Sequence, residues 1–98
     1  MTPEEALAQL AKYREEIDAI DREIVDILNR RTRVVEEIGR VKQDVQFPVY
    51  EPKRERDVFR NVASHNRGPL SVDAAQRIFE RIIDEMRTLQ KMRAQENR

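Results

Sequence analysis

Apolar residues recur at intervals of three and four along the N-terminal part of the chain, which is the spacing of one helix face. Thr2 as N-cap, Pro3 at the first helical position and Glu5 closing a capping box are typical of a helix start. The pattern predicts a long helix over residues 3–43. Its apolar positions are Leu7, Leu10, Ile17, Ile20, Ile24, Ile27, Leu28, Val34, Val35, Ile38 and Val41.

A break follows at residues 43–51, where Pro48 disfavours helical backbone at the residue before it. Pro52 fits the first turn of a second helix, predicted over residues 52–66. Gly68 is expected to form the C-terminal cap of this helix, because glycine readily adopts the left-handed conformation found there. The sequence therefore predicts two short breaks and no repeat.

A third helix is predicted over residues 71–93, with Ser71 as its N-cap. Residues from Arg93 onward are expected to fray. Gln90 continues the apolar stripe of this helix four residues after Met86, so its amide is either a helix-end group or a donor directed into a cavity. The apolar positions are Ala75, Ile78, Phe79, Ile82, Ile83, Met86 and Leu89.

The length of the first helix predicts an oligomer. Forty helical residues form a rod of about 60 Å, whereas a compact domain of this size has a radius of gyration of only about 13 Å. One chain cannot cover the apolar stripe of such a rod. We therefore expect a single all-α domain, residues 1–98, that forms an intertwined antiparallel homodimer.

Composition excludes several classes of protein. Lys plus Arg and Asp plus Glu each number 19, so the basic excess of a nucleic-acid-binding protein is missing. Without cysteine and with one histidine, His65, we expect no thiolate or histidine metal site, no catalytic triad and no cofactor. No apolar run suits a membrane span and the polar N-terminus is unlike a signal peptide, so a cytoplasmic protein is expected.

Most of the charges, Glu36 and Arg40 among them, are interpreted as a solvated surface, but some fall on the apolar stripe. Arg31 has only apolar neighbours one helical turn away. It extends outward to solvent, pairs with an acid from another helix, or meets an anionic ligand. Lys42 follows eleven residues later, on the same face and about 16 Å along the axis. It is either a simple helix-end lysine or a second cation of an anion site.

Arg14 lies about 25 Å from Arg31 along the same rod, too far to serve one site in one chain. It either pairs with Asp18 on the surface or reaches the partner's site in an antiparallel dimer. Together, these cations and the Gln90 amide describe a pocket for a polyanion that contains no nucleophile.

Several stretches of the chain closely resemble the AroQ class of chorismate mutases, especially those that stand alone or precede a synthase. The resemblance covers almost the whole chain, and its most specific part is the combination of Arg31, Lys42 and residues 54–56. The matching stretches are residues 19–24, 38–42, 48–56, 68–70, 78–79 and 82–83, with Arg31, Val34 and Gln90.

The resemblance implies rearrangement of chorismate to prephenate in aromatic amino-acid biosynthesis. It implies that Arg31 and the partner's Arg14 hold the two carboxylates, and that Lys42 and Gln90 contact the ether oxygen. It further implies that Glu55 accepts a hydrogen bond from the ring hydroxyl and that the backbone amide of Glu51 aids this contact. Arg54 would order the pocket, and Ile38 would pack against the ring.

Two positions depart from the family pattern. Glu51 replaces a common Asp, which a backbone contact tolerates, and Met86 replaces a hydroxyl or small residue near a substrate carboxylate and cannot donate that hydrogen bond. An isochorismate pyruvate lyase and a non-catalytic helical dimerisation module remain alternatives. A partner synthase of the same pathway is a further possibility, whereas nucleic-acid and membrane partners are not expected.

Overall fold

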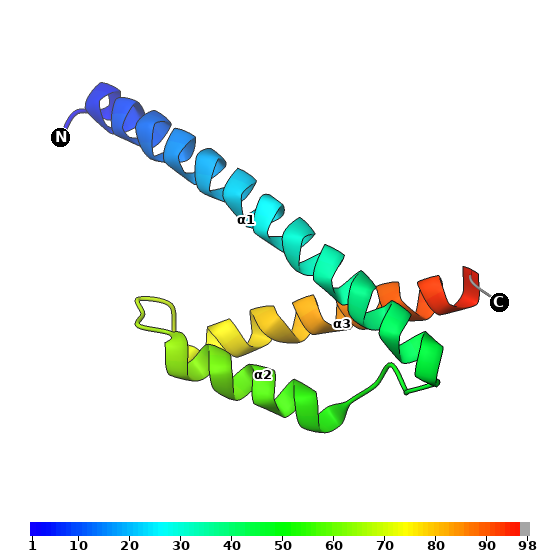
Figure 1. Ribbon diagram of the computed structural model, residues 1–98. Helices are drawn as coiled ribbons and strands as arrows, with labels where there is room; N and C mark the ends of the chain where they lie inside the picture. The colour runs from blue at the N-terminus through cyan, green and yellow to red at the C-terminus, as the bar shows by residue number, and fades with distance from the viewer. Residues whose placement is uncertain (97–98) are drawn as a thin grey trace. The chain divides into compact units, whose positions relative to one another are not determined.

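The computed structural model describes residues 1–96, and its secondary structure there consists of three α-helices (Figure 1). Helix α1 spans Pro3–Val45, α2 spans Pro52–His65 and α3 spans Val72–Glu96. The predicted all-α class with one very long helix is confirmed.

The helices begin where the sequence signals place them. The backbone N–H of Glu5 donates to Thr2 Oγ1 at 3.1 Å, and that of Ala74 donates to Ser71 Oγ at 3.1 Å. These bonds satisfy backbone donors that the first turn of a helix leaves without partners. Pro52 is the first residue of α2, as predicted.

Helix α1 ends at Val45, two residues beyond the predicted end, without glycine or asparagine. Gln46 adopts a left-handed conformation with φ of 58°, and the N–H groups of Gln46 and Phe47 donate to Gln43 O and Lys42 O. This is the hydrogen-bond pattern of a Schellman motif. Because the motif here uses glutamine at the left-handed position, the sequence contains no sign of it.

The predicted Gly68 cap is wrong, and so is the predicted fraying for residues 93–96, which are helical; residues 97 and 98, on which the rest of that prediction falls, lie outside the described residues. Asn66 is the C-cap of α2, and its side chain accepts from Gly68 N and donates to Leu70 O, which closes the connection to α3. Helix α3 continues to Glu96 because Arg93 forms ion pairs with Glu36 and Glu96.

The chain divides into two compact units, Met1–Arg33 and the remainder from Val34 onward. The first unit is a single stretch of α1, and its apolar face is largely exposed. Exposed fractions on that face lie between 45% and 64% for Leu7, Leu10, Ile17, Ile20, Ile24 and Ile27. A lone helix has no second element against which to bury such a stripe.

The second unit contains the end of α1 together with α2 and α3, and α2 and α3 pack side by side (Figure 1). Its buried apolar residues are Val35, Ala75 and Ile83. Gly39 is buried on α1, and the polar side chain of Gln90 is buried on α3. Most of the predicted stripe of α3 therefore faces the interior of this unit, with Gln90 at its end, whereas Ile78 is 50% exposed.

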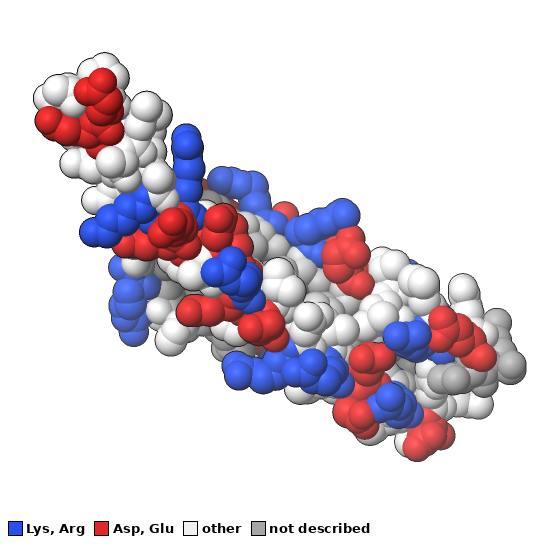
Figure 2. Space-filling model, turned by 90° about the horizontal axis from the view of Figure 1, so that it is seen from above, with Lys and Arg blue, Asp and Glu red and all other residues white. Residues whose placement is uncertain are grey.

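Acidic and basic side chains intermix on the face of the molecule that Figure 2 shows. The described helices include none that is both long enough and apolar enough to cross a membrane.

Candidate functional site

Lys42 is a nearly buried cation at the end of α1. Its side chain is 12% exposed, and Nζ donates to the Val49 carbonyl at 3.0 Å and pairs with Glu51 Oε1 at 2.7 Å. The segment between α1 and α2 therefore folds back over the lysine. Burial of the charge is compatible with folding because two oxygen partners compensate it.

Gln90 is the buried polar residue of α3, at 8% exposure. Its Nε2 donates to the Val35 carbonyl of α1 at 3.1 Å, and its side chain lies over Gly39. A primary amide has two N–H donors, so this bond leaves one N–H for another acceptor. The amide is therefore buried between α3 and α1, and its role as a donor to a ligand stays a prediction.

Lys42, which lies on α1, and Gln90, which contacts α1 from α3, share one face of α1. Lys42 follows Val35 by seven residues, which is two turns less about 20°, and lies about 10 Å further along the axis. The Gln90 amide is bonded at the level of Val35. The Gln90 amide and Lys42 therefore meet one face of α1 at levels about 10 Å apart along its axis.

The contact between Gly39 and Gln90 yields a stability prediction. A Cβ at position 39 would lie 3.5 Å from Gln90 Cγ, an ordinary van der Waals distance. Because alanine favours helix over glycine, we expect Gly39→Ala to raise the free energy of unfolding by about 0.5–1 kcal/mol. Thermal denaturation followed by circular dichroism measures this. Gly39→Val serves as the contrast, because the methyl branches of valine would collide with the Gln90 amide and lower the melting temperature. Equal melting temperatures for the two variants would contradict this geometry.

Glu55 belongs to a second charged cluster, which joins α2 to α3. Its side chain is 22% exposed, and Oε1 lies 3.6 Å from Arg87 Nη2. Arg87 also pairs with Asp84 at 2.8 Å and lies over the ring of Tyr50, 5.1 Å from the centroid. The sequence interpretation missed Arg87, although it lies three residues before Gln90 and four after Ile83, on the same face of α3.

The other predicted site residues differ in exposure, and two of them belong to the N-terminal unit. Arg14 and Arg31 belong to the N-terminal unit, where Arg14 is exposed and Arg31 is half-buried. In the second unit Met86 is half-buried, whereas Ile38 and Arg54 are exposed.

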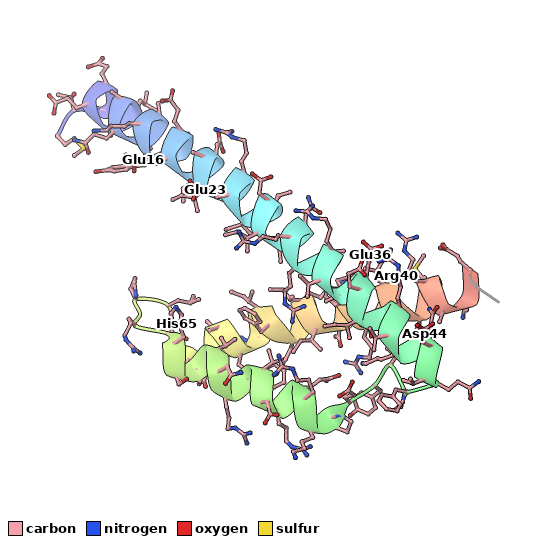
Figure 3. All side chains as sticks on the ribbon, viewed as in Figure 1. Glu16, Glu23, Glu36, Arg40, Asp44 and His65 are labelled. Atoms are coloured by element: carbon pink, nitrogen blue, oxygen red, sulfur yellow. The ribbon has the colours of Figure 1, made fainter. Side chains whose placement is uncertain are left out.

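A shallow hollow of about 290 Å³ lies on another side of Gln90. Glu36 and Arg40 line it from α1, where both are labelled in Figure 3, and Leu89, Gln90 and Arg93 line it from α3. Glu36 is only 24% exposed on its side chain and pairs with Arg93 at 3.1 Å. Glu36 therefore stays on the surface but is partly covered by an arginine from the end of α3.

The described residues include no cluster of His, Cys, Asp or Glu suited to a metal ion. His65 is exposed at the C-terminal end of α2 (Figure 3). The hydrogen bonds from Arg93 to Glu96 and to Glu36 raise the pKa of Arg93 above its ordinary value.

The chemistry available here is that of charge and hydrogen bonding. Lys42 and Gln90 donate, and Glu55 accepts. These groups suit a protein that binds a small anion and stabilises negative charge by preorganised donors. Comparison with known proteins identifies the class more closely.

The family model for chorismate mutase type II matches residues 13–91. A bifunctional chorismate mutase/prephenate dehydratase of Aquifex aeolicus (strain VF5) is 33% identical over an alignment of 89 residues that covers 87% of this chain and 25% of that protein. A protein of the same name from Neisseria gonorrhoeae is 37% identical over 76 residues, 78% of this chain and 20% of its own. The chain thus spans about a quarter of the length of these relatives.

Solved structures agree with the sequence comparison. Chorismate mutase (form II) from Thermus thermophilus superposes with a TM-score of 0.82 at 31% identity, covering 85% of this chain and 94% of that one. Form I of the same enzyme gives a TM-score of 0.76 at 32% identity, with 80% and 98% covered. The chain belongs to the chorismate mutase type II family.

Proposed function

We propose that this chain rearranges chorismate to prephenate. The observation that carries the proposal is that Lys42 of α1 and Gln90 of α3 are two preorganised donors at one face of α1, in a member of this family. The rearrangement is a one-step pericyclic reaction without proton transfer or covalent intermediate. It therefore needs a site that holds the compact, chair-like conformer and stabilises negative charge at the ether oxygen.

In this proposal Lys42 and Gln90 contact the ether oxygen. The second N–H of Gln90 is the donor, because the first is bonded to Val35 O. Lys42 contacts the ether oxygen and a substrate carboxylate in place of Glu51, whose side chain is 47% exposed and can move aside. Both donors are partly or fully buried, and electrostatic contacts are stronger in a buried site than in water.

The remaining roles rest on the family resemblance. Glu55 accepts a hydrogen bond from the ring hydroxyl, aided by the Glu51 backbone amide, and Arg54 orders the pocket. Arg31 and the partner's Arg14 hold the two carboxylates. Ile38 packs against the ring, and Met86 lines the pocket.

We also propose an intertwined antiparallel homodimer, with the whole chain forming one domain of it. The proposal is supported by the exposed apolar face of Met1–Arg33, because a helix with such a face is marginally stable in water by itself. A second copy, running antiparallel, offers an identical apolar stripe of the same length.

In a cell, we place the reaction in aromatic amino-acid biosynthesis, in the cytoplasm. Two relatives carry the name of prephenate dehydratase beside that of chorismate mutase. An enzyme that consumes prephenate, or a synthase of the same pathway, is accordingly the partner we propose.

The decisive experiment is to mix the purified chain with chorismate, follow the ultraviolet absorbance and identify the product by mass spectrometry and nuclear magnetic resonance. Prephenate is the expected product. Conversion of isochorismate to salicylate and pyruvate instead would identify a lyase. No reaction with either substrate, from a folded dimer, would identify a non-catalytic dimerisation module.

We expect turnover to change little between mildly acidic and mildly basic pH. The reason is that the Gln90 amide has no proton to lose in this range. The matched variant is Gln90→Glu, in which a carboxyl donates only while protonated, so its activity should rise as the pH is lowered. Initial rates across the range, with circular dichroism at each pH, test this. A steep loss for the unaltered protein, with the fold intact, would count against the role of Gln90.

A further inference from the structure

Arg87 is held by three different parts of the second unit. Its guanidinium pairs with Asp84 on its own helix at 2.8 Å, lies over the Tyr50 ring before α2, and stands 3.6 Å from Glu55 on α2. The Arg87 side chain is 27% exposed. An arginine fixed by an acid and an aromatic ring has little remaining freedom, because its planar group suits both contacts.

The distance to Glu55 determines what Arg87 does there. At 3.6 Å the contact is an ion pair and not a hydrogen bond. The carboxylate is therefore attracted and oriented while its capacity to accept hydrogen bonds remains.

We infer that Arg87 is a positioning residue that orients Glu55 toward the ring hydroxyl of the substrate, and thereby sets the preference for a hydroxylated ring. This inference rests on the proposed function and adds to it a residue on α3. Asp84 and Tyr50 fix the position of the Arg87 guanidinium, and Arg87 orients the Glu55 carboxylate. The carboxylate then accepts a hydrogen bond from the ring hydroxyl. Arg87 itself does not touch the reacting atoms.

The test is the variant Arg87→Met, which keeps the length of the side chain but removes its charge. Its kcat/KM is measured with chorismate and with the analogue that lacks the ring hydroxyl. We expect a loss of about ten- to hundredfold for chorismate, the range for a hydrogen bond to a charged group. We expect almost no change for the analogue, because it lacks the hydroxyl that Glu55 would bind.

Two further variants separate positioning from a structural role. Arg81→Met is the control, since Arg81 is an exposed arginine of the same helix, paired only one turn away with Glu85 in the described contacts. It should behave like the unaltered protein. In the double variant Glu55→Gln with Arg87→Met, the loss should equal that of Glu55→Gln alone, because both changes interrupt one chain of contacts.

Each outcome is decisive. Equal losses on both substrates would overturn the inference, since Arg87 would then act on a carboxylate or on the fold. Normal activity of Arg87→Met would overturn it as well and leave the proposed function standing. If the unaltered chain does not convert chorismate, both proposals fall together.

Discussion

Lys42→Ala is expected to lower kcat/KM for chorismate by at least about 10²- to 10³-fold, which is the cost of removing one preorganised donor to a developing oxyanion. The loss should appear in kcat, because negative charge at the ether oxygen grows only in the transition state, and also as a higher KM, because the contact with the substrate carboxylate is already present in the ground state. Steady-state rates over a wide range of chorismate concentration separate kcat from KM.

The same substitution also removes two structural contacts, the bond to Val49 O and the ion pair with Glu51. Circular dichroism and sedimentation are therefore needed to show that the variant is folded and dimeric. Lys91→Ala is the matched control, because Lys91 is an exposed lysine of α3 outside the proposed site. A folded Lys42→Ala variant with near-normal turnover would refute the assigned role of Lys42.

Two inactive variants should regain activity when mixed. Arg14 and Arg31 lie about 25 Å apart along α1, so the proposed site takes Arg14 from one subunit and Arg31 from the other. Homodimers of Arg14→Ala or of Arg31→Ala lack a complete site. A heterodimer has one site that lacks both arginines and one that retains both.

The experiment co-refolds differently tagged Arg14→Ala and Arg31→Ala chains and isolates the heterodimer by sequential affinity steps. Up to about half of the normal activity per dimer is expected, since one of two sites is complete. The control heterodimer combines two differently tagged Arg14→Ala chains, in which neither site is complete. Absence of recovery in a folded heterodimer would exclude a shared site.

Much of the fold could be predicted because helices leave local signals in a sequence. The caps at Thr2 and Ser71 and the spacing of apolar residues predict three helices, and the structure contains them. The end of α1 could not be predicted, because a left-handed glutamine takes the place of the usual glycine.

The site was less accessible to sequence reasoning, since its contacts join distant segments. Gln90 could be singled out by its position on an apolar stripe. The bond from Lys42 to Val49 depends on how the connecting segment folds back, and the pair Glu36–Arg93 depends on where two helices meet. Periodicity predicts which face a residue occupies but not which residue of another helix it contacts.

Under the proposed function, the contact between Lys42 and Glu51 makes the binding of chorismate an exchange of one carboxylate for another at the lysine. The side chain of Lys42 is largely shielded from water, and its ammonium group already pairs with the Glu51 carboxylate. An incoming carboxylate replaces one oxygen partner by another, so the lysine needs little new desolvation and little movement. In this arrangement Glu51 acts as an internal stand-in for the substrate, and the affinity of the site depends on how readily that stand-in is released to water.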